Sequence, residues 1–169
     1  MPSARKRSRA TGSERLRLRS GQRAAALIFY LDTSALVKLV FDEPGSKHAA
    51  ELWDRAESVV SSQLVYPEAR AAAAAARRGR RITVATLRRA VDKIDGLCAE
   101  LDVIGLDPDL AHTAGELAEA HGLRGYGAVH LATALSIEAD SMLLATWDGD
   151  LANAAVAAGC SVSPPPVRR

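Results

Sequence analysis

Short apolar runs alternate with longer stretches of helical periodicity from residue 28 onward. We expect the apolar runs to form strands, and they read LIFYLD, SVVSS, DVIGL and SMLLAT, followed by CSVS as a candidate edge strand. The stretches between them carry apolar residues at intervals of three and four, which predicts amphipathic helices. Strands and helices that alternate in this way are typical of βαβ units and a parallel sheet. The hydrophobic pattern therefore predicts the α/β class.

The predicted helices begin and end where start and stop signals occur. Pro67 lies in the first turn of an alanine-rich helix and Gly79 at its end, while Gly122 closes a later helix. The consecutive alanines at 71–76 are good helix formers and favour a face for close packing. In chain order, the predicted helices are SALVKLVF, SKHAAELWDRA, VYPEARAAAAAARRG, ITVATLRRAVDKIDGLCAEL, PDLAHTAGELAEAHG, LRGYGAVHLATAL and DLANAAVAAG.

The chain has the size of one domain. Its 169 residues can bury a core without disulfides or metals, and 48% hydrophobic content with 4% aromatics favours closely packed helices around a modest sheet. Cys98 and Cys160 show no metal-ligand or disulfide spacing, which suits a reducing cytoplasm. The longest apolar run, residues 24–31, is far shorter than the roughly 20 residues of a membrane span. We expect one domain over 27–163, followed by a C-terminal tail over 164–169.

Charge is distributed unevenly along the chain. Residues 1–23 hold eight Lys or Arg against one acidic residue, a charge of +7, whereas the remaining 14 basic and 19 acidic residues give −5. The N-terminal segment lacks apolar periodicity, so we expect a basic, disordered extension over residues 1–26. A flexible arm that binds nucleic acid or another polyanion is the alternative.

Three carboxylates follow predicted strands. Asp32 comes directly after the first strand, Asp148 directly after the fourth, and Glu68 lies in the first turn of the helix after the second. Each acid alone could cap or stabilise a helix, but ligands bind at the carboxyl ends of parallel strands, and all three acids share this edge. Carboxylates on neighbouring strands repel unless a cation lies between them, and an all-oxygen site favours Mg²⁺ or Mn²⁺. Ser34 and Thr146 are placed to hydrogen-bond these acids.

Four motifs in order resemble those of PIN-domain ribonucleases, most closely the VapC-type toxins of toxin–antitoxin pairs. The motifs are YLDTSALVKL, SSQLVYPEARAA, LRGYGAVHLATAL and LLATWDGDLANAA, and the resemblance runs from about residue 28 to residue 162. It implies a three-layer α/β/α fold around a central, mainly parallel sheet of four to five strands. It also implies an endoribonuclease that uses Mg²⁺ or Mn²⁺ to hydrolyse single-stranded or loop RNA. By position, Asp32 matches the first acid of the family, Glu68 the second and Asp148 the last, with Asp150 as a further metal ligand.

Gly127 departs from the family pattern. The family usually has an aspartate at this position, as in YDAVHLATA, whereas this chain reads YGAVHLATA. Glycine costs about 1 kcal/mol relative to alanine inside a helix, so helix stability did not select it. The predicted cluster is one carboxylate short, and we expect an attenuated or inactive nuclease. Three explanations stay open: a change that silences a harmful nuclease, a degenerate toxin, or a site that Asp148 and Asp150 complete.

His130 lies three residues after Gly127, on nearly the same face of the predicted helix. We expect it to be a packed structural histidine, with proton transfer as the alternative.

The resemblance also implies partners. VapC-type toxins are usually dimers, are neutralised by a small antitoxin, and bind operator DNA only through that antitoxin. A hypothesis of a different class is a catalytically silent PIN-fold module that sequesters antitoxin or acts as a co-repressor. A third is a nucleic-acid-binding protein that works mainly through its basic N-terminal segment. The RNA target and the identity of the antitoxin cannot be derived from the sequence.

An acid-free stretch with seven arginines extends from Arg70 to Val91. It is either a surface that follows RNA phosphates or a solvated helix face whose charges complement a helix C-terminus. Because few aromatics interleave these arginines, stacked recognition of single strands is not indicated. The RNA-binding candidates are Arg77, Arg78, Arg80 and Arg81.

Overall fold

Five parallel strands form one sheet, as the hydrophobic pattern predicts. In the computed structural model, which describes residues 27–138 and 142–165, the strands are β1 (Ile28–Leu31), β2 (Ser58–Ser62), β3 (Asp102–Ile104), β4 (Met142–Ala145) and β5 (Ser161–Ser163). Their order across the sheet is β3-β2-β1-β4-β5, and every pairing is parallel. The strand order therefore reverses at β1, which lies between β2 and β4.

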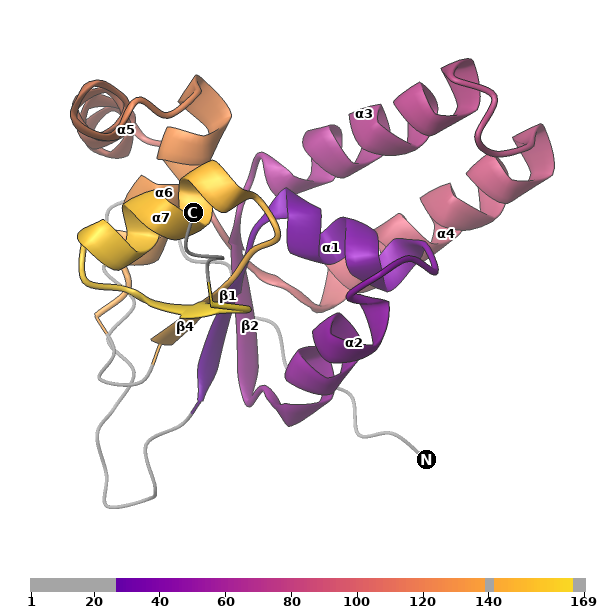
Figure 1. Cartoon of the computed structure of the whole chain (residues 1–169), viewed down its shortest axis with the longest axis horizontal. Helices are drawn as coiled ribbons and strands as arrows, with labels where there is room; N and C mark the ends of the chain where they lie inside the picture. The colour runs from indigo at the N-terminus through magenta and orange to yellow at the C-terminus, as the bar shows by residue number, and fades with distance from the viewer. Residues whose placement is uncertain (1–26, 139–141, 166–169) are drawn as a thin grey trace.

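Helices connect these strands in an alternating order (Figure 1). The predicted helix that contains Gly127 begins at Gly125, two residues later than expected, because Arg124 keeps an extended backbone as its N-cap. The expected extension over residues 1–26 lies outside the described residues, as do residues 166–169 of the tail. The helices are α1 (Thr33–Val40), α2 (Ser46–Arg55), α3 (Val65–Arg78), α4 (Val84–Glu100), α5 (Pro108–His121), α6 (Gly125–Leu135) and α7 (Gly149–Ala157).

The core lies on both faces of the sheet, which gives three layers. Alternate residues of a strand point to opposite faces. On β1, Phe29 and Leu31 pack against residues of α1, α2, α3 and α4, whereas Tyr30 packs with Leu131 of α6 and Leu151 of α7. The predicted α/β/α architecture is thereby confirmed. In the described residues, no helix has the length and apolar character that crossing a membrane requires.

Helices α3 and α4 form a hairpin that extends away from the sheet (Figure 1). The alanine-rich sequence of α3 permits close packing at its base, where Ala69, Ala73 and Ala76 are buried. The exposed arginines Arg78, Arg80 and Arg81 lie at the far end of this hairpin. At 1.5 Å per residue, that end is about 15 Å along α3 from Glu68.

Candidate functional site

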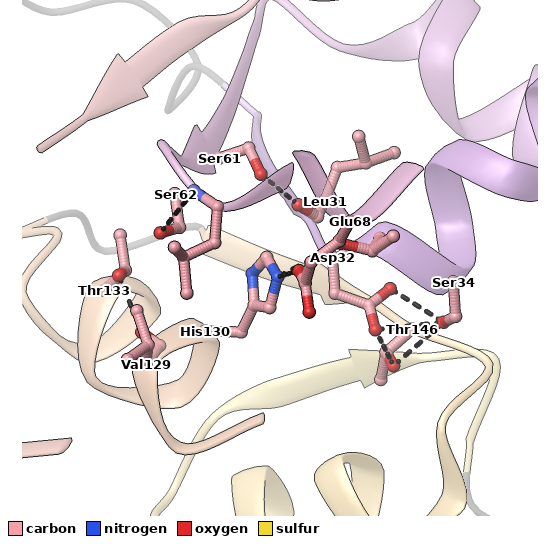
Figure 2. Close-up of polar contacts among 12 residues, drawn as sticks. Leu31, Asp32, Ser34, Ser61, Ser62, Glu68, Val129, His130, Thr133 and Thr146 are labelled. Atoms are coloured by element: carbon pink, nitrogen blue, oxygen red, sulfur yellow. Dashed lines mark hydrogen bonds and ion pairs between the residues drawn. The ribbon is translucent and has the colours of Figure 1, made fainter. Parts of the chain in front are cut away.

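The carboxyl ends of β1 and β4 position the candidate site. Leu31 pairs with Ala145, so Asp32 and Thr146, which follow them, are neighbours where the strand order reverses. Open parallel sheets bind ligands at such a point. Figure 2 shows Glu68 of α3 and His130 of α6 close to Asp32 at this edge.

The Asp32 carboxylate is buried and hydrogen-bonded on both oxygens. Asp32 is 4% exposed. Oδ1 accepts from the Ala35 backbone N–H (2.9 Å), Oδ2 accepts from the Thr146 hydroxyl (2.9 Å), and Ser34 Oγ lies 2.8 and 3.0 Å from the two oxygens. Burial raises the pKa of Asp32; the hydrogen bonds from Ala35, Ser34 and Thr146 offset only part of this effect. The protein thus holds a carboxylate in a fixed orientation where ionisation is costly.

The same two hydroxyls fix the loop that carries Asp148. Ser34 Oγ accepts from the Trp147 N–H (2.7 Å), and Thr146 Oγ1 accepts from the Asp148 N–H (3.0 Å). The Asp148 carboxylate caps α7, because its Oδ1 accepts from two backbone N–H groups in the first turn of that helix. The cap uses Oδ1, so Oδ2 is the oxygen suited to serve a ligand.

Asp150 lies on the exposed side of the first turn of α7. It lines an open cleft of about 320 Å³ together with His121 of α5 and Asn153. The structure therefore places Asp150 beside a polar cleft between α5 and α7.

Glu68 belongs to a second hydrogen-bonded group. Its Oε2 accepts from the Thr33 hydroxyl and lies 2.8 Å from His130 Nε2. On the other side of the ring, His130 Nδ1 lies 2.8 Å from the Tyr30 hydroxyl. His130 is 3% exposed and Tyr30 is fully buried. Figure 2 shows the ring directed at Glu68 from α6.

This group keeps Glu68 ionised and oriented. Burial raises the pKa of Tyr30 well above its ordinary value, so the phenol stays protonated and can donate to Nδ1. When the phenol donates to Nδ1, the ring proton lies on Nε2 and is donated to Glu68. Burial also raises the pKa of Glu68, but the hydrogen bonds from His130 and Thr33 outweigh it, so the pKa lies below its ordinary value.

Gly127 lies in the first turn of α6, three residues before His130. A side chain at this position would enter open space: among the described residues, apart from its chain neighbours and its own helix backbone, no atom lies within 4 Å of the Cβ position. The first carbon of a side chain therefore fits here without displacing a neighbour.

The predicted ligands are of the chemical type that a divalent metal prefers, but the described residues do not form a complete metal-binding group. Asp32, Glu68 and Asp148 supply carboxylate oxygens, which Mg²⁺ and Mn²⁺ prefer. Residues 27–138 and 142–165, however, contain no group of three or more His, Cys, Asp or Glu side chains arranged to hold a metal. In the same ranges, no buried side-chain polar atom lacks a hydrogen-bond partner. Of the predicted ligands, Asp148 caps α7 through one oxygen and Asp150 lines the cleft between α5 and α7.

Sequence reasoning did not find the contact between His130 and Tyr30. The residues are 100 positions apart, and only the packing of α6 on the sheet face that carries Tyr30 brings them together. The position of His130 on the Gly127 face was the one available signal. Thr33, whose hydroxyl donates to Glu68, carried no signal in the sequence.

The fold and the acidic carboxyl edge define a class of protein. The sequence matches the PIN domain family over residues 29–157, and the chain belongs to this family. Within it, the chain is of the VapC type: Ribonuclease VapC45 of Mycobacterium tuberculosis (strain CDC 1551 / Oshkosh) is 43% identical over 137 residues, covering 81% of this chain and 95% of VapC45. The resemblance that the four motifs carry is thereby confirmed.

Two solved structures share the fold at lower identity. VapC20 (Rv2549c) of M. tuberculosis, a sarcin-ricin loop cleaving toxin, is 21% identical with a TM-score of 0.57, covering 75% of this chain and 94% of that one. A chain of a toxin-antitoxin complex from Klebsiella pneumoniae is 20% identical with a TM-score of 0.50, covering 69% of this chain and 83% of that one.

Proposed function

We propose that this chain is a metal-dependent endoribonuclease, the toxin of a toxin–antitoxin pair, and that Gly127 attenuates or abolishes its activity. The observation that carries the proposal is the buried Asp32 carboxylate where the strand order reverses. A buried carboxylate is costly unless it is paired, and the N-cap bond that Asp32 gives to α1 uses one oxygen and does not require a charged group. A divalent cation would offset that cost, which agrees with the nuclease name of the 43% identical relative.

Each residue of the site has a distinct part in this proposal. Mg²⁺ or Mn²⁺, when bound by Asp32, Glu68 and Asp148, would lower the pKa of a water and neutralise charge that develops on the phosphate. Ser34 and Thr146 hold the Asp32 carboxylate in one orientation. His130 donates to Glu68 and so acts as a positioning residue for that carboxylate.

Gly127 is the reason to expect low activity. It lies in the first turn of the helix that carries His130, where an aspartate would extend into open space. Without that carboxylate the site offers fewer anionic ligands, so the cation and the scissile phosphate are held less firmly. Whether the glycine is natural or introduced, its expected effect is the same.

Partners follow from the class of protein. The chain in the Klebsiella pneumoniae complex shares this fold, which supports a cognate antitoxin for this chain. RNA is the proposed substrate, and operator DNA is the proposed target of the complex with antitoxin. A homodimer and a cytoplasmic location stay predictions.

The incomplete ligand set also favours a second candidate function. A PIN-fold module that binds antitoxin without cutting RNA needs the fold but not the full cluster of acids, and the described residues hold no such full cluster. It would sequester antitoxin or act as a co-repressor.

Cleavage of total RNA separates these functions. The chain, its Gly127→Asp variant and the Asp32→Ala blank are incubated with RNA in Mg²⁺ and in Mn²⁺. We expect strong cleavage by Gly127→Asp, weak or no cleavage by the chain itself, and none by the blank. Equal cleavage by the first two would show that the present acids suffice. No cleavage by folded Gly127→Asp protein would reject the nuclease in favour of the binding module.

A further inference from the structure

Trp147 lies in the loop between β4 and α7, directly before Asp148. Its backbone N–H donates to Ser34 Oγ (2.7 Å), the same hydroxyl that hydrogen-bonds the Asp32 carboxylate. Its side chain is half-buried and packs against the apolar cluster on the sheet face that α1, α2, α3 and α4 cover. The backbone of Trp147 therefore contacts the candidate site, while its indole is held by the core.

Gly45, in the turn between α1 and α2, makes room for this indole. A Cβ at position 45 would lie 2.5 Å from the indole Nε1 and 2.9 Å from Cε2, both closer than a Cβ tolerates. The φ of Gly45 is +98°, in the left-handed region that favours glycine. Ser46 Oγ fixes the turn, because it accepts from the Glu43 N–H (3.0 Å) and donates to the Phe41 carbonyl (2.7 Å). The indole thus packs directly against a turn whose backbone is itself held in place.

His48 of α2 contacts the same indole. The two rings meet edge to face, with centroids 5.9 Å apart and an interplanar angle of 69°. His48 Nε2 lies 2.9 Å from the Ser163 hydroxyl of β5, and the Ser163 carbonyl accepts from the Thr146 N–H (3.0 Å). Helix α2 and strand β5 therefore both contact the segment that leads into Asp148.

We propose that Trp147 is a positioning residue whose anchored indole fixes the direction of the Asp148 carboxylate. This inference rests on the proposed function, in which Asp148 is a metal ligand, and extends it to a residue that is not an acid. Asp148 Oδ1 is used by the cap on α7, so the direction of Oδ2 depends on where the loop places the start of that helix. Gly149, which follows, has no side chain that could hold the segment instead.

A small shift of this loop is expected to matter, because a misplacement of about 1 Å at a reacting centre can lower a rate by about 100-fold. A smaller aliphatic side chain at position 147 would leave space beside Gly45 into which the loop can relax. Trp53 of α2 offers the comparison that separates positioning from core packing. It lines the same apolar cavity as Trp147 and packs against the same cluster, but it precedes no residue of the site.

Amide hydrogen exchange, followed by NMR on the full chain, tests the anchor without metal or RNA. The reporter is the Leu151 N–H, which donates to Asp148 Oδ1 (3.1 Å). The variants are Trp147→Leu, the ring-preserving Trp147→Phe, and Gly45→Ala, whose added Cβ would displace the indole. Trp53→Leu is the matched control, since it removes an indole from the same cavity. Urea unfolding measures the global stability of each variant, against which the exchange rates are compared.

We expect the Leu151 amide to exchange at least about tenfold faster in Trp147→Leu and in Gly45→Ala than in Trp53→Leu, and within about threefold of the parent rate in Trp147→Phe. An equal increase in Trp147→Leu and Trp53→Leu would overturn the inference, because the indole would then only fill the core. If Trp147→Leu does not fold, the comparison of Gly45→Ala with Trp53→Leu decides in the same way.

Cleavage connects the anchor to the site. In the Gly127→Asp background, Trp147→Leu should lower the turnover number about 10- to 100-fold at unchanged KM for RNA, and Trp53→Leu should stay within about threefold of its parent. Equal turnover in these two variants would overturn the link between Trp147 and the site.

The exchange measurement also separates this inference from the nuclease proposal. Faster Leu151 exchange in Trp147→Leu than in Trp53→Leu, in a chain whose Gly127→Asp variant cuts no RNA, would leave the anchor standing while the nuclease proposal fails. Cleavage by Gly127→Asp together with equal exchange in the two tryptophan variants would do the reverse.

Discussion

The candidate site has two halves, one around Asp32 and one on α6, and they differ in how many of the expected side chains are present. Around Asp32 every element is present: the carboxylate, two hydroxyls, a backbone N–H and a loop fixed to the same hydroxyls. On the α6 side, His130 and Tyr30 form an equally ordered hydrogen-bonded group, yet Gly127 leaves open space where a further acid would fit. The surroundings of the site are complete, and in the proposed function one carboxylate is missing from them.

This difference distinguishes residues that hold the site in shape from a position that would only add a metal ligand. In the described part of the chain, the buried polar groups around Asp32 and Glu68 are all hydrogen-bonded, so removing one of them would disturb packing and leave its neighbour unsatisfied. Among the described residues, a Cβ at position 127 would meet no atom within 4 Å beyond its chain neighbours and its own helix backbone, so exchanging an acid for glycine there removes few packing contacts at that carbon. If Gly127 stands in place of a metal-binding acid, as we propose, this chain keeps the architecture of the site while its chemistry is weakened.

The largest expected effect is the loss of RNA cleavage when Asp32 is replaced. In a Gly127→Asp chain, a further Asp32→Ala change should lower RNA cleavage about a thousandfold or more, because it removes a central ligand and the charge that it carries. Cleavage kinetics measure the effect, and circular dichroism confirms that the variant is folded. Cleavage at the level of the Gly127→Asp parent would contradict the assignment of Asp32.

Two substitutions of His130 test its hydrogen bonds with Glu68 and Tyr30 separately. His130→Gln can keep a donor near Glu68, whereas His130→Asn keeps a partner near Tyr30 and removes that donor. In the Gly127→Asp background we expect cleavage to fall about 10- to 100-fold in His130→Asn and clearly less in His130→Gln, since a group that hydrogen-bonds a metal ligand orients it. The turnover number and KM are measured for both. Equal decreases would indicate that His130 only fills space.

The buried Asp32 should cost stability near neutral pH in the absence of metal. Since its pKa is higher in the folded than in the unfolded chain, the folded state binds more protons between the two values, and stability falls as pH rises through that window. Asp32→Asn cannot ionise and should be more stable than the parent by about 1–2 kcal/mol at pH 7. Urea unfolding in EDTA should show this difference shrinking on acidification. A difference that grows on acidification would refute the account.

The smallest expected effect concerns the end of the α3–α4 hairpin. Changing Arg80 and Arg81 to alanine should lower the salt dependence of RNA binding by about 0.7 in slope for each phosphate that these arginines neutralise. The ratio of cleavage between the Gly127→Asp and parent chains should not change, since these arginines lie far from the acids along α3. Titrations at several salt concentrations provide the slope. An unchanged slope would make these arginines a solvated helix face.

Much of this architecture is predictable from the sequence, because it is encoded locally. The strands and helices follow the apolar pattern, and Asp32 follows β1 at an edge that topology alone identifies. The role of His130 was not predictable in the same way, since its contacts with Tyr30 and Glu68 join segments 100 and 62 positions away. The Asp148 cap was recognised as an alternative, but only side-chain positions show which of its oxygens it uses.

The most direct test of the incomplete cluster is Mn²⁺ binding by calorimetry to the full chain, Gly127→Asp and Gly127→Asn. The asparagine variant matches the aspartate in shape and lacks its charge. We predict that Gly127→Asp binds Mn²⁺ at least about tenfold more tightly than the other two, because a carboxylate is added to the proposed ligands Asp32, Glu68 and Asp148. Equal affinity in all three chains would contradict the claim that one missing carboxylate limits this site.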